Sequence, residues 1–174
     1  LKAEGIEVGS SLIEKDKISL AKEILQKANK KNILFLLPID HIIANEVSID
    51  AKIKETEGIE IPSGWKGVDI GPQTLNRFSN LVYKANTILW NGPLGVFEIG
   101  KFSHGTLKIA NLLAEMTTKG TTTIVGGGDS VAAVKKFNLA NKFSHISTGG
   151  GASLEFLEGE QLPGIVALEE KNKN

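Results

Sequence analysis

Cysteine is absent from this chain of 174 residues. Disulfides, thiolate metal sites and a cysteine nucleophile are therefore excluded together. Long hydrophobic runs are also lacking. The longest apolar stretches, such as "ILFLLPI" (33–39), fall far short of the roughly 18 to 20 residues that span a bilayer. The sequence therefore predicts no membrane helix, and the lack of cysteine fits a cytosolic compartment.

An excess of charge of either sign is lacking as well, because 20 basic and 20 acidic residues cancel. Proteins that bind nucleic acid or anionic membranes usually carry a basic surplus, so we expect neither partner. A small anionic ligand is still compatible with this composition, because backbone amides can bind it. The three histidines, His41, His104 and His145, share no metal-ligand spacing, and we interpret them as structural or surface residues rather than a zinc site.

The remaining composition is that of an ordinary globular domain, with 41% hydrophobic and 23% charged residues. The chain opens with "LKAEGIEVG", which has neither an initiator methionine nor the apolar core of a signal peptide, and this suggests a fragment of a longer protein. We expect the last residues, 169–174, to form a frayed, solvated tail.

Short apolar runs alternate with segments of helical spacing along most of the chain. This alternation predicts βαβ units, a parallel sheet and an α/β fold. The predicted strands are residues 33–37, 87–90, 121–125 and 145–148. The predicted helices are residues 16–28, 75–85, 102–117, 131–137 and 152–158, and residues 45–67 read as short strands and loops.

Four glycine-bearing turns each follow an apolar strand and precede a helix. They are "VDIGP" (68–72), "LWNGPLG" (89–95), "IVGGGDS" (124–130) and "ISTGGGAS" (146–153). In a parallel sheet the carboxyl ends of the strands share one edge, where open α/β sheets bind ligands. Glycine lets the backbone approach a ligand closely, and helix N-termini attract anions. The sequence thus predicts a phosphate site at this edge.

Neither glycine triplet matches a standard phosphate fingerprint. No Lys-Ser or Lys-Thr follows either triplet, as a Walker A loop requires. The third glycine position of the dinucleotide pattern holds Val131 in one tract and Leu154 in the other, which argues against an NAD-dependent oxidoreductase. Each triplet alone is also compatible with a simple tight turn from strand to helix.

Two acidic residues beside these turns have alternative interpretations. Asp129 is either a helix N-cap or a carboxylate that holds Mg²⁺ on a bound polyphosphate, and both roles can coexist. Glu98 is either a solvated loop residue or a partner for ribose hydroxyls. Trp65 and Trp90 are compatible with the core or with the walls of a ring pocket.

These segments together resemble the C-terminal, nucleotide-binding lobe of the phosphoglycerate kinase family. The motifs that carry the resemblance are "VGSSL", "LPIDHIIA", "DIGPQT", "LWNGPLGVFE", "GGGDSVAA", "HISTGGGASLEFLEG" and "LPGI", in the family's order and approximate spacing. The match covers essentially the whole chain. It implies one nucleotide-binding lobe over residues 1–174, incomplete at its N-terminus, with a three-layer αβα, Rossmann-like parallel sheet.

The resemblance also implies an activity. The family reversibly transfers a phosphoryl group between 1,3-bisphosphoglycerate and Mg-ADP, giving 3-phosphoglycerate and Mg-ATP in glycolysis, and its members are cytosolic and typically monomeric. The lobe that binds phosphoglycerate and an upstream phosphate loop with lysine are both missing here. We therefore expect the isolated fragment to be inactive. The alternative is a non-catalytic module that binds nucleotide or phosphate.

Site residues follow from the resemblance, motif by motif. Leu12, Gly67, Val68 and Val96 would line the adenine pocket, Asn91, Pro93 and Gly95 would shape the floor under the nucleotide, and Glu98 would bind the ribose hydroxyls. For the phosphates, Gly127, Gly128, Asp129 and Ser130 would hold the chain of ADP or ATP, with Asp129 toward Mg²⁺. Gly149, Gly150 and Gly151 would face the transferring phosphoryl group and, with Gly128, carry the catalytic role.

Overall fold

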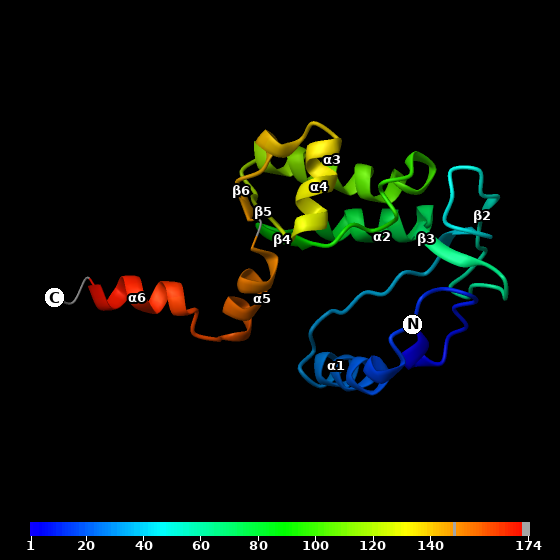
Figure 1. Ribbon diagram of the computed structural model, residues 1–174, viewed down its shortest axis with the longest axis horizontal. Helices are drawn as coiled ribbons and strands as arrows, with labels where there is room; N and C mark the ends of the chain where they lie inside the picture. Colours follow the sequence, from blue (N-terminus) through cyan, green and yellow to red (C-terminus); the bar gives the residue numbers. More distant parts are fainter. Residues whose placement is uncertain (148, 172–174) are drawn as a thin grey trace. The chain divides into compact units, whose positions relative to one another are not determined.

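The computed structural model describes residues 1–147 and 149–171 of the chain (Figure 1). The helices are α1 (Ile18–Lys30), α2 (Pro72–Val82), α3 (His104–Thr118), α4 (Gly128–Lys136), α5 (Gly150–Glu158) and α6 (Pro163–Lys171). The strands are β1 (His41–Ala44), β2 (Ile53–Glu55), β3 (Lys66–Ile70), β4 (Thr87–Asn91), β5 (Thr122–Gly126) and β6 (His145–Ser147). Short 3₁₀ turns cover Lys2–Glu4, Lys15–Lys17, Gly100–Phe102 and Ala140–Lys142.

The chain divides into two compact units. The first unit contains Leu1–Lys84 and Leu94–Ile109, and the second contains Ala85–Pro93 and Ala110–Asn174. Among the described residues, no helix is both long enough and apolar enough to cross a membrane. Residues 169–171 continue α6, and 172–174 lie outside the described residues, so the frayed tail expected over 169–174 stays a prediction.

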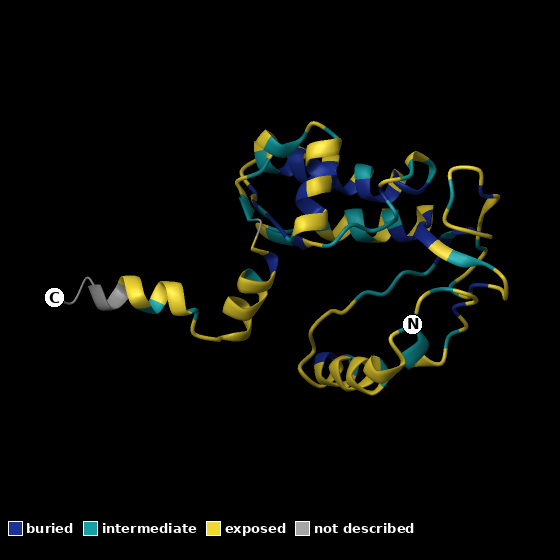
Figure 2. Cartoon of the chain, in the orientation of Figure 1, coloured by how far each residue is buried: buried dark blue, intermediate teal, exposed yellow. Residues whose placement is uncertain are grey.

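The second unit contains a parallel sheet with the strand order β4-β5-β6. Val125, in β5, is fully buried, and α4 packs on this strand. Figure 2 shows buried and exposed residues alternating along α4, as in a helix with one face on a sheet. The predicted α/β fold and the strands predicted near 87–90, 121–125 and 145–148 are confirmed, except that residue 148 lies outside the described residues.

A buried threonine aligns the elements of this unit. The hydroxyl of Thr117 donates to the carbonyl of Leu113 at 2.8 Å, so the hydroxyl of Thr123 donates to Thr117, at 2.6 Å. Thr123 and Ser144 are also joined twice, by Thr123 N–H to Ser144 Oγ at 3.0 Å and by Ser144 N–H to Thr123 Oγ1 at 3.2 Å. The end of α3, the strand β5 and the start of β6 are therefore tied at one point.

The first unit contains an antiparallel sheet with the order β2-β1-β3. Its core gathers Ala44, Ala51, Val68 and Phe102, with Ile42, Val96 and Ile99 packed against them. The turn "VDIGP" follows β3, so the prediction that all four glycine-bearing turns share one parallel edge is wrong for this turn. A run of apolar residues indicates a strand but does not indicate its partner.

The strand predicted for residues 33–37 is not formed. Ile33, Leu34 and Phe35 are 57%, 68% and 50% exposed, and the amide of Ile33 donates to Ala28 at the end of α1. Within the described residues, the backbone of 34–38 forms no hydrogen bond. An apolar run becomes a strand only where a neighbouring strand supplies its hydrogen bonds, and none lies beside it here.

Helix α2 is capped from a distance by Asp40. The carboxylate of Asp40, which is almost fully buried, accepts hydrogen bonds from Gln73 N–H at 2.8 Å and from Thr74 N–H at 2.7 Å. The hydroxyl of Thr74 also donates to it, at 2.6 Å. Glycine is required at Gly71, because a Cβ there would overlap the Asp40 carboxylate. This cap holds the start of α2 to the segment before β1.

Replacement of this cap tests its contribution to stability. We expect Asp40→Ala to lower the free energy of unfolding by about 2 to 4 kcal/mol, because it leaves the buried N–H of Thr74 and the part-buried N–H of Gln73 without an acceptor. Urea titration followed by circular dichroism measures the change. The control Asp50→Ala removes an exposed carboxylate of the same unit and should stay within about 0.5 kcal/mol. Equal effects of the two variants would contradict the capping role.

His41 makes the stability of the first unit depend on pH. Burial lowers the pKa of His41 from its ordinary value of 6.5, although its hydrogen bond to the Ile59 carbonyl and the charge of Asp40 act in the opposite direction. Because the folded state resists protonation, the stability linked to His41 is present above pH 6.5 and is lost as the pH falls through the lowered pKa.

The variant His41→Gln keeps an N–H donor for Ile59 but does not titrate. Between about pH 7.5 and about pH 5.5, the unaltered chain should lose more unfolding free energy than the variant does. Urea titrations of both proteins at the two pH values measure the difference. Parallel losses in the two proteins would show that His41 is not a source of the pH dependence.

Candidate functional site

The two glycine triplets lie at the ends of neighbouring parallel strands, where each begins a helix. Gly126 and Ser147, the last residues of β5 and β6, are partners in the sheet register. The amide of Gly127 donates to the Ser147 carbonyl at 3.2 Å, which extends the ladder by one step. The first helical hydrogen bonds run from Val131 N–H to the Gly127 carbonyl and from Ser153 N–H to the Gly149 carbonyl.

Three N–H groups therefore remain without a partner at the start of each helix, counting only the described residues. They belong to Gly128, Asp129 and Ser130 in α4 and to Gly150, Gly151 and Ala152 in α5. Each helix start also carries the positive end of a helix dipole. Two adjacent helix starts with six amide donors form an arrangement that binds anions, phosphate in particular. The expected anion site is thus built from backbone.

Five of these six residues, all but Ala152, border a cavity of about 360 Å³ in the second unit. Its lining residues are Asn91, Gly92, Gly127, Gly128, Asp129, Ser130, Gly150, Gly151 and Leu154. Gly149, the N-cap of α5, is not among them. The volume lies in the range of small-molecule sites.

The two glycine tracts touch each other directly. A Cβ on Gly150 would lie 2.7 Å from the backbone nitrogen of Gly127 and closer still to its Cα. Gly127 itself has φ of +90°, in the left-handed region that favours glycine. One glycine is therefore required by backbone conformation and the other by close approach. The triplets form tight turns and also shape the site.

Asn91, the last residue of β4, lies beside both tracts. A Cβ on Gly127 would be 3.2 Å from Asn91 Oδ1, and a Cβ on Gly150 would be 3.5 Å from Asn91 Nδ2. The carboxamide thus adds a donor and an acceptor where the two helix starts meet. The sequence predicted Asn91 as a site residue but not this position between the triplets.

Asp129 does not cap α4. Gly127 holds the N-cap position, and the Asp129 side chain is exposed and forms no hydrogen bond or ion pair with the described residues. Its carboxylate is therefore available at the cavity, and the N-cap interpretation is wrong. No group of three or more metal-ligating side chains occurs in the described part of the chain. One carboxylate beside a phosphate cradle suits Mg²⁺, which takes its other oxygens from phosphate and water.

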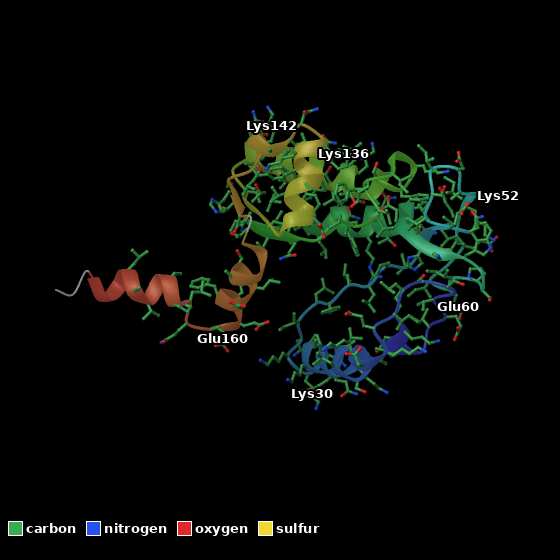
Figure 3. All side chains as sticks on the ribbon, in the orientation of Figure 1. Lys30, Lys52, Glu60, Lys136, Lys142 and Glu160 are labelled. Carbon is green, nitrogen blue, oxygen red and sulfur yellow. The ribbon has the colours of Figure 1, made fainter. Side chains whose placement is uncertain are left out.

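The lining of the cavity contains no lysine or arginine. The lysines of this unit that Figure 3 labels, Lys136 and Lys142, belong to the last turn of α4 and to the 3₁₀ turn after it. Lys136 therefore lies at the opposite end of α4 from the glycine tract. Within this cavity, backbone dipoles are what would balance the charge of an anion.

The first unit holds the other predicted site residues. The amide of Val96 donates to the Val68 carbonyl at 2.9 Å, which joins the two predicted adenine segments, and Gly67 N–H donates to Ser11 Oγ at 3.0 Å. Val68 is only 2% exposed and belongs to the core, so little of its surface is available to a ligand. Leu12 is 99% exposed.

Gly95 and Glu98 also belong to the first unit, and Pro93 belongs to the second. A Cβ on Gly95 would lie 2.5 Å from both Asp69 Oδ1 and the Phe102 carbonyl, so glycine is required there by packing. Glu98 is exposed.

Sequence reasoning missed the carboxylate that supports the Gly95 segment. Asp69 is buried, and its two oxygens accept hydrogen bonds from Ile70 N–H at 2.9 Å and Gly105 N–H at 2.7 Å. Burial raises the pKa of Asp69, and the two amides oppose this rise. Its position in "VDIGP", between buried apolar residues, was the available signal, because a buried carboxylate requires fixed partners.

The contact between the triplets predicts different costs for two neighbouring substitutions. Gly150→Ala should lower the free energy of unfolding by about 1 to 3 kcal/mol, because its methyl group overlaps Gly127. Gly151→Ala is the matched control, because a Cβ there meets no atom within 4 Å, and its stability should not fall. Urea titration of both variants measures the difference. Similar stabilities would mean that the tracts do not pack as described.

Comparison with known proteins agrees with the fold and with the motifs. The chain matches the family model described as "Phosphoglycerate kinase" over residues 1–160. It is 56% identical over 169 residues to "Phosphoglycerate kinase 3, cytosolic" of Arabidopsis thaliana, an alignment that covers 97% of this chain and 42% of that protein. Over 177 residues it is 53% identical to the phosphoglycerate kinase of Thermosipho africanus, covering 99% of this chain and 43% of that protein.

A solved structure also matches. The phosphoglycerate kinase of Coxiella burnetii superposes with a TM-score of 0.86 at 45% identity, covering 92% of this chain and 41% of that one. The chain spans about two fifths of the length of these relatives. On the family match, the sequence identity and the shared fold, the chain belongs to the phosphoglycerate kinase family.

Proposed function

We propose that this chain supplies the nucleotide-binding part of a phosphoglycerate kinase. The full reaction would be the reversible transfer of a phosphoryl group between 1,3-bisphosphoglycerate and Mg-ADP, giving 3-phosphoglycerate and Mg-ATP in glycolysis. The observation that carries the proposal is the cavity at which two glycine-rich helix starts present five amide donors beside the exposed carboxylate of Asp129. Membership of the phosphoglycerate kinase family supports a nucleotide as the anion that binds at this cavity.

The start of α4 would hold the phosphate chain of the nucleotide. The N–H groups of Gly128, Asp129 and Ser130 point from the first turn, where the helix dipole favours negative charge. Gly127 shapes this turn through its positive φ. The exposed carboxylate of Asp129 would hold Mg²⁺ on the phosphate oxygens. When bound, Mg²⁺ neutralises part of the polyphosphate charge.

The start of α5 would face the phosphoryl group in transit. Gly150 and Gly151 line the same cavity as the α4 amides, and Gly149 sets the start of the helix as its N-cap. Phosphoryl transfer depends mainly on positioning and on stabilisation of the charge on the transferring oxygens. Amides fixed by a helix supply that stabilisation without reorganising during the reaction. With Gly128, these glycines would carry the catalytic role of this part of the protein.

The nucleoside would bind to residues of the family's adenine and ribose motifs. The joined segments of Gly67–Val68 and Gly95–Val96, with the exposed Leu12, would contact adenine. Asn91 and Pro93, of the second unit, keep their predicted contact with the nucleotide, and Glu98 would accept hydrogen bonds from the ribose hydroxyls.

The isolated chain is proposed to bind nucleotide without transferring phosphate. Its cavity lacks a cationic side chain, and groups that stabilise the transferring charge can each contribute about 10² to 10⁵ in rate. The same observation favours the second candidate function, a non-catalytic nucleotide- or phosphate-binding module. Relatives of this chain are named as cytosolic and as chloroplastic, and we propose a cytosolic, monomeric parent protein.

Calorimetry with Mg-ADP and a coupled kinase assay test this proposal on the unaltered chain. Binding without turnover is expected. Absence of binding would contradict the nucleotide site, and turnover by the chain alone would contradict the proposed need for groups outside it.

Substitution of Asp129 tests the metal role. Asp129→Asn should weaken Mg-ADP binding by about 10-fold or more, because it removes the charged metal ligand. When a chelator removes Mg²⁺, the variant should bind ADP no more weakly than the unaltered chain, because the substitution removes a negative charge that would repel the phosphates. Calorimetric titrations with and without Mg²⁺ separate the two effects.

The matched control is Glu158→Gln, which neutralises an exposed carboxylate at the end of α5, outside the cavity lining. It should bind Mg-ADP as the unaltered chain does. Undiminished Mg-ADP affinity in Asp129→Asn would remove the metal role assigned to Asp129.

A further inference from the structure

The turn after β4 is held by two side chains. The backbone N–H of Gly92 donates to Ser130 Oγ at 2.6 Å, and Trp90 Nε1 donates to the Gly92 carbonyl at 2.7 Å. Gly92 has φ of +96°, so the chain reverses sharply here. The N–H of Gly92 is therefore fixed by Ser130 in the first turn of α4, and its carbonyl is fixed by Trp90 in β4.

The hydroxyl oxygen of Ser130 takes part in this scaffold. Ser130 is 0% exposed, and its oxygen already accepts the Gly92 amide. The cavity borders on Ser130, whose backbone N–H has no partner among the described residues, whereas its hydroxyl already holds the Gly92 amide. The side chain and the backbone of this one residue thus have different tasks.

The position of Asn91 depends on the same hydrogen bond. Asn91 immediately precedes Gly92, and its carboxamide lies against Gly127 and Gly150, where the two helix starts meet. The Gly92–Ser130 bond connects residues 38 positions apart in the sequence. It ties the turn after β4 to the first turn of α4, beyond the pairing of Asn91 with Gly126 in the sheet.

We propose that Ser130 is a positioning residue, whose hydroxyl holds the Asn91–Pro93 turn against the start of α4 so that Asn91 and the α4 amides meet one phosphate chain. The inference rests on the proposed function, because the ligand is the nucleotide. It goes beyond that function by assigning the side chain of Ser130 to the turn rather than to the ligand.

Two measurements on the whole ¹⁵N-labelled chain test the inference. One is amide hydrogen exchange at Gly92, measured by NMR without ligand, and the other is the Kd for Mg-ADP from calorimetry. In Ser130→Ala, we expect exchange at Gly92 to accelerate and the Kd to rise, each by about 10-fold, the effect of one lost hydrogen bond. Ser130→Thr retains the hydroxyl and should restore both values to within about 3-fold.

The matched control is Ser153→Ala. Ser153 occupies the first turn of α5, and its hydroxyl contacts Gly149 and Ser147 instead of the β4 turn. Exchange at Gly92 should be unchanged in this variant. If Ser130→Ala leaves either Gly92 exchange or the Kd unchanged, the inference is overturned. An unchanged exchange rate with a weaker Kd would assign the hydroxyl to the ligand instead.

A second variant decides the outcome if Ser130→Ala does not fold. Trp90→Phe removes the other hydrogen bond to Gly92 without altering α4, and Trp90 is buried away from the ligand. It should also weaken Mg-ADP binding by about 10-fold, and an undiminished affinity would overturn the inference. Failure of the unaltered chain to bind Mg-ADP would overturn the proposed function and the inference with it, whereas losses confined to the variants concern the turn alone.

Discussion

The direct contact between the backbones of Gly127 and Gly150 is the constraint on which the rest of the site depends. It exists because β5 and β6 are parallel neighbours, joined one step further by the Gly127 amide and the Ser147 carbonyl. Without side chains at the contact, two helix starts come close enough to border one cavity. Asn91 then fits beside both tracts, and the Thr123 hydrogen bonds hold the strands that carry them.

The parts of this site that could be predicted from the sequence are those encoded over short distances. A strand, a glycine triplet and a helix follow each other within about fifteen residues, and parallel strands place such turns at one edge. The hydrogen bond from Gly92 to Ser130 could not be predicted in this way, because it joins residues far apart in the chain. Asp129 illustrates the same limit, since its residue type suits both a cap and a metal ligand.

The errors in the first unit have a related physical cause. The apolar run 33–37 has the composition of a strand, but pairing depends on a neighbour that the run itself does not specify. The turn after β3 was expected at the parallel edge, because apolar periodicity carries no information about strand direction. Asp40 caps α2 although more than thirty residues separate them in the chain, and no local sequence pattern indicates this role.

The cavity between the glycine tracts has a further kinetic consequence. Its lining is made of neutral backbone dipoles and one carboxylate, and the whole chain has a formal net charge of zero. Dipole fields fall off faster with distance than the field of a lysine cluster, so this surface does not attract a distant polyphosphate. The proposed nucleotide would therefore reach the site by unsteered diffusion, and selectivity for it would arise only after contact.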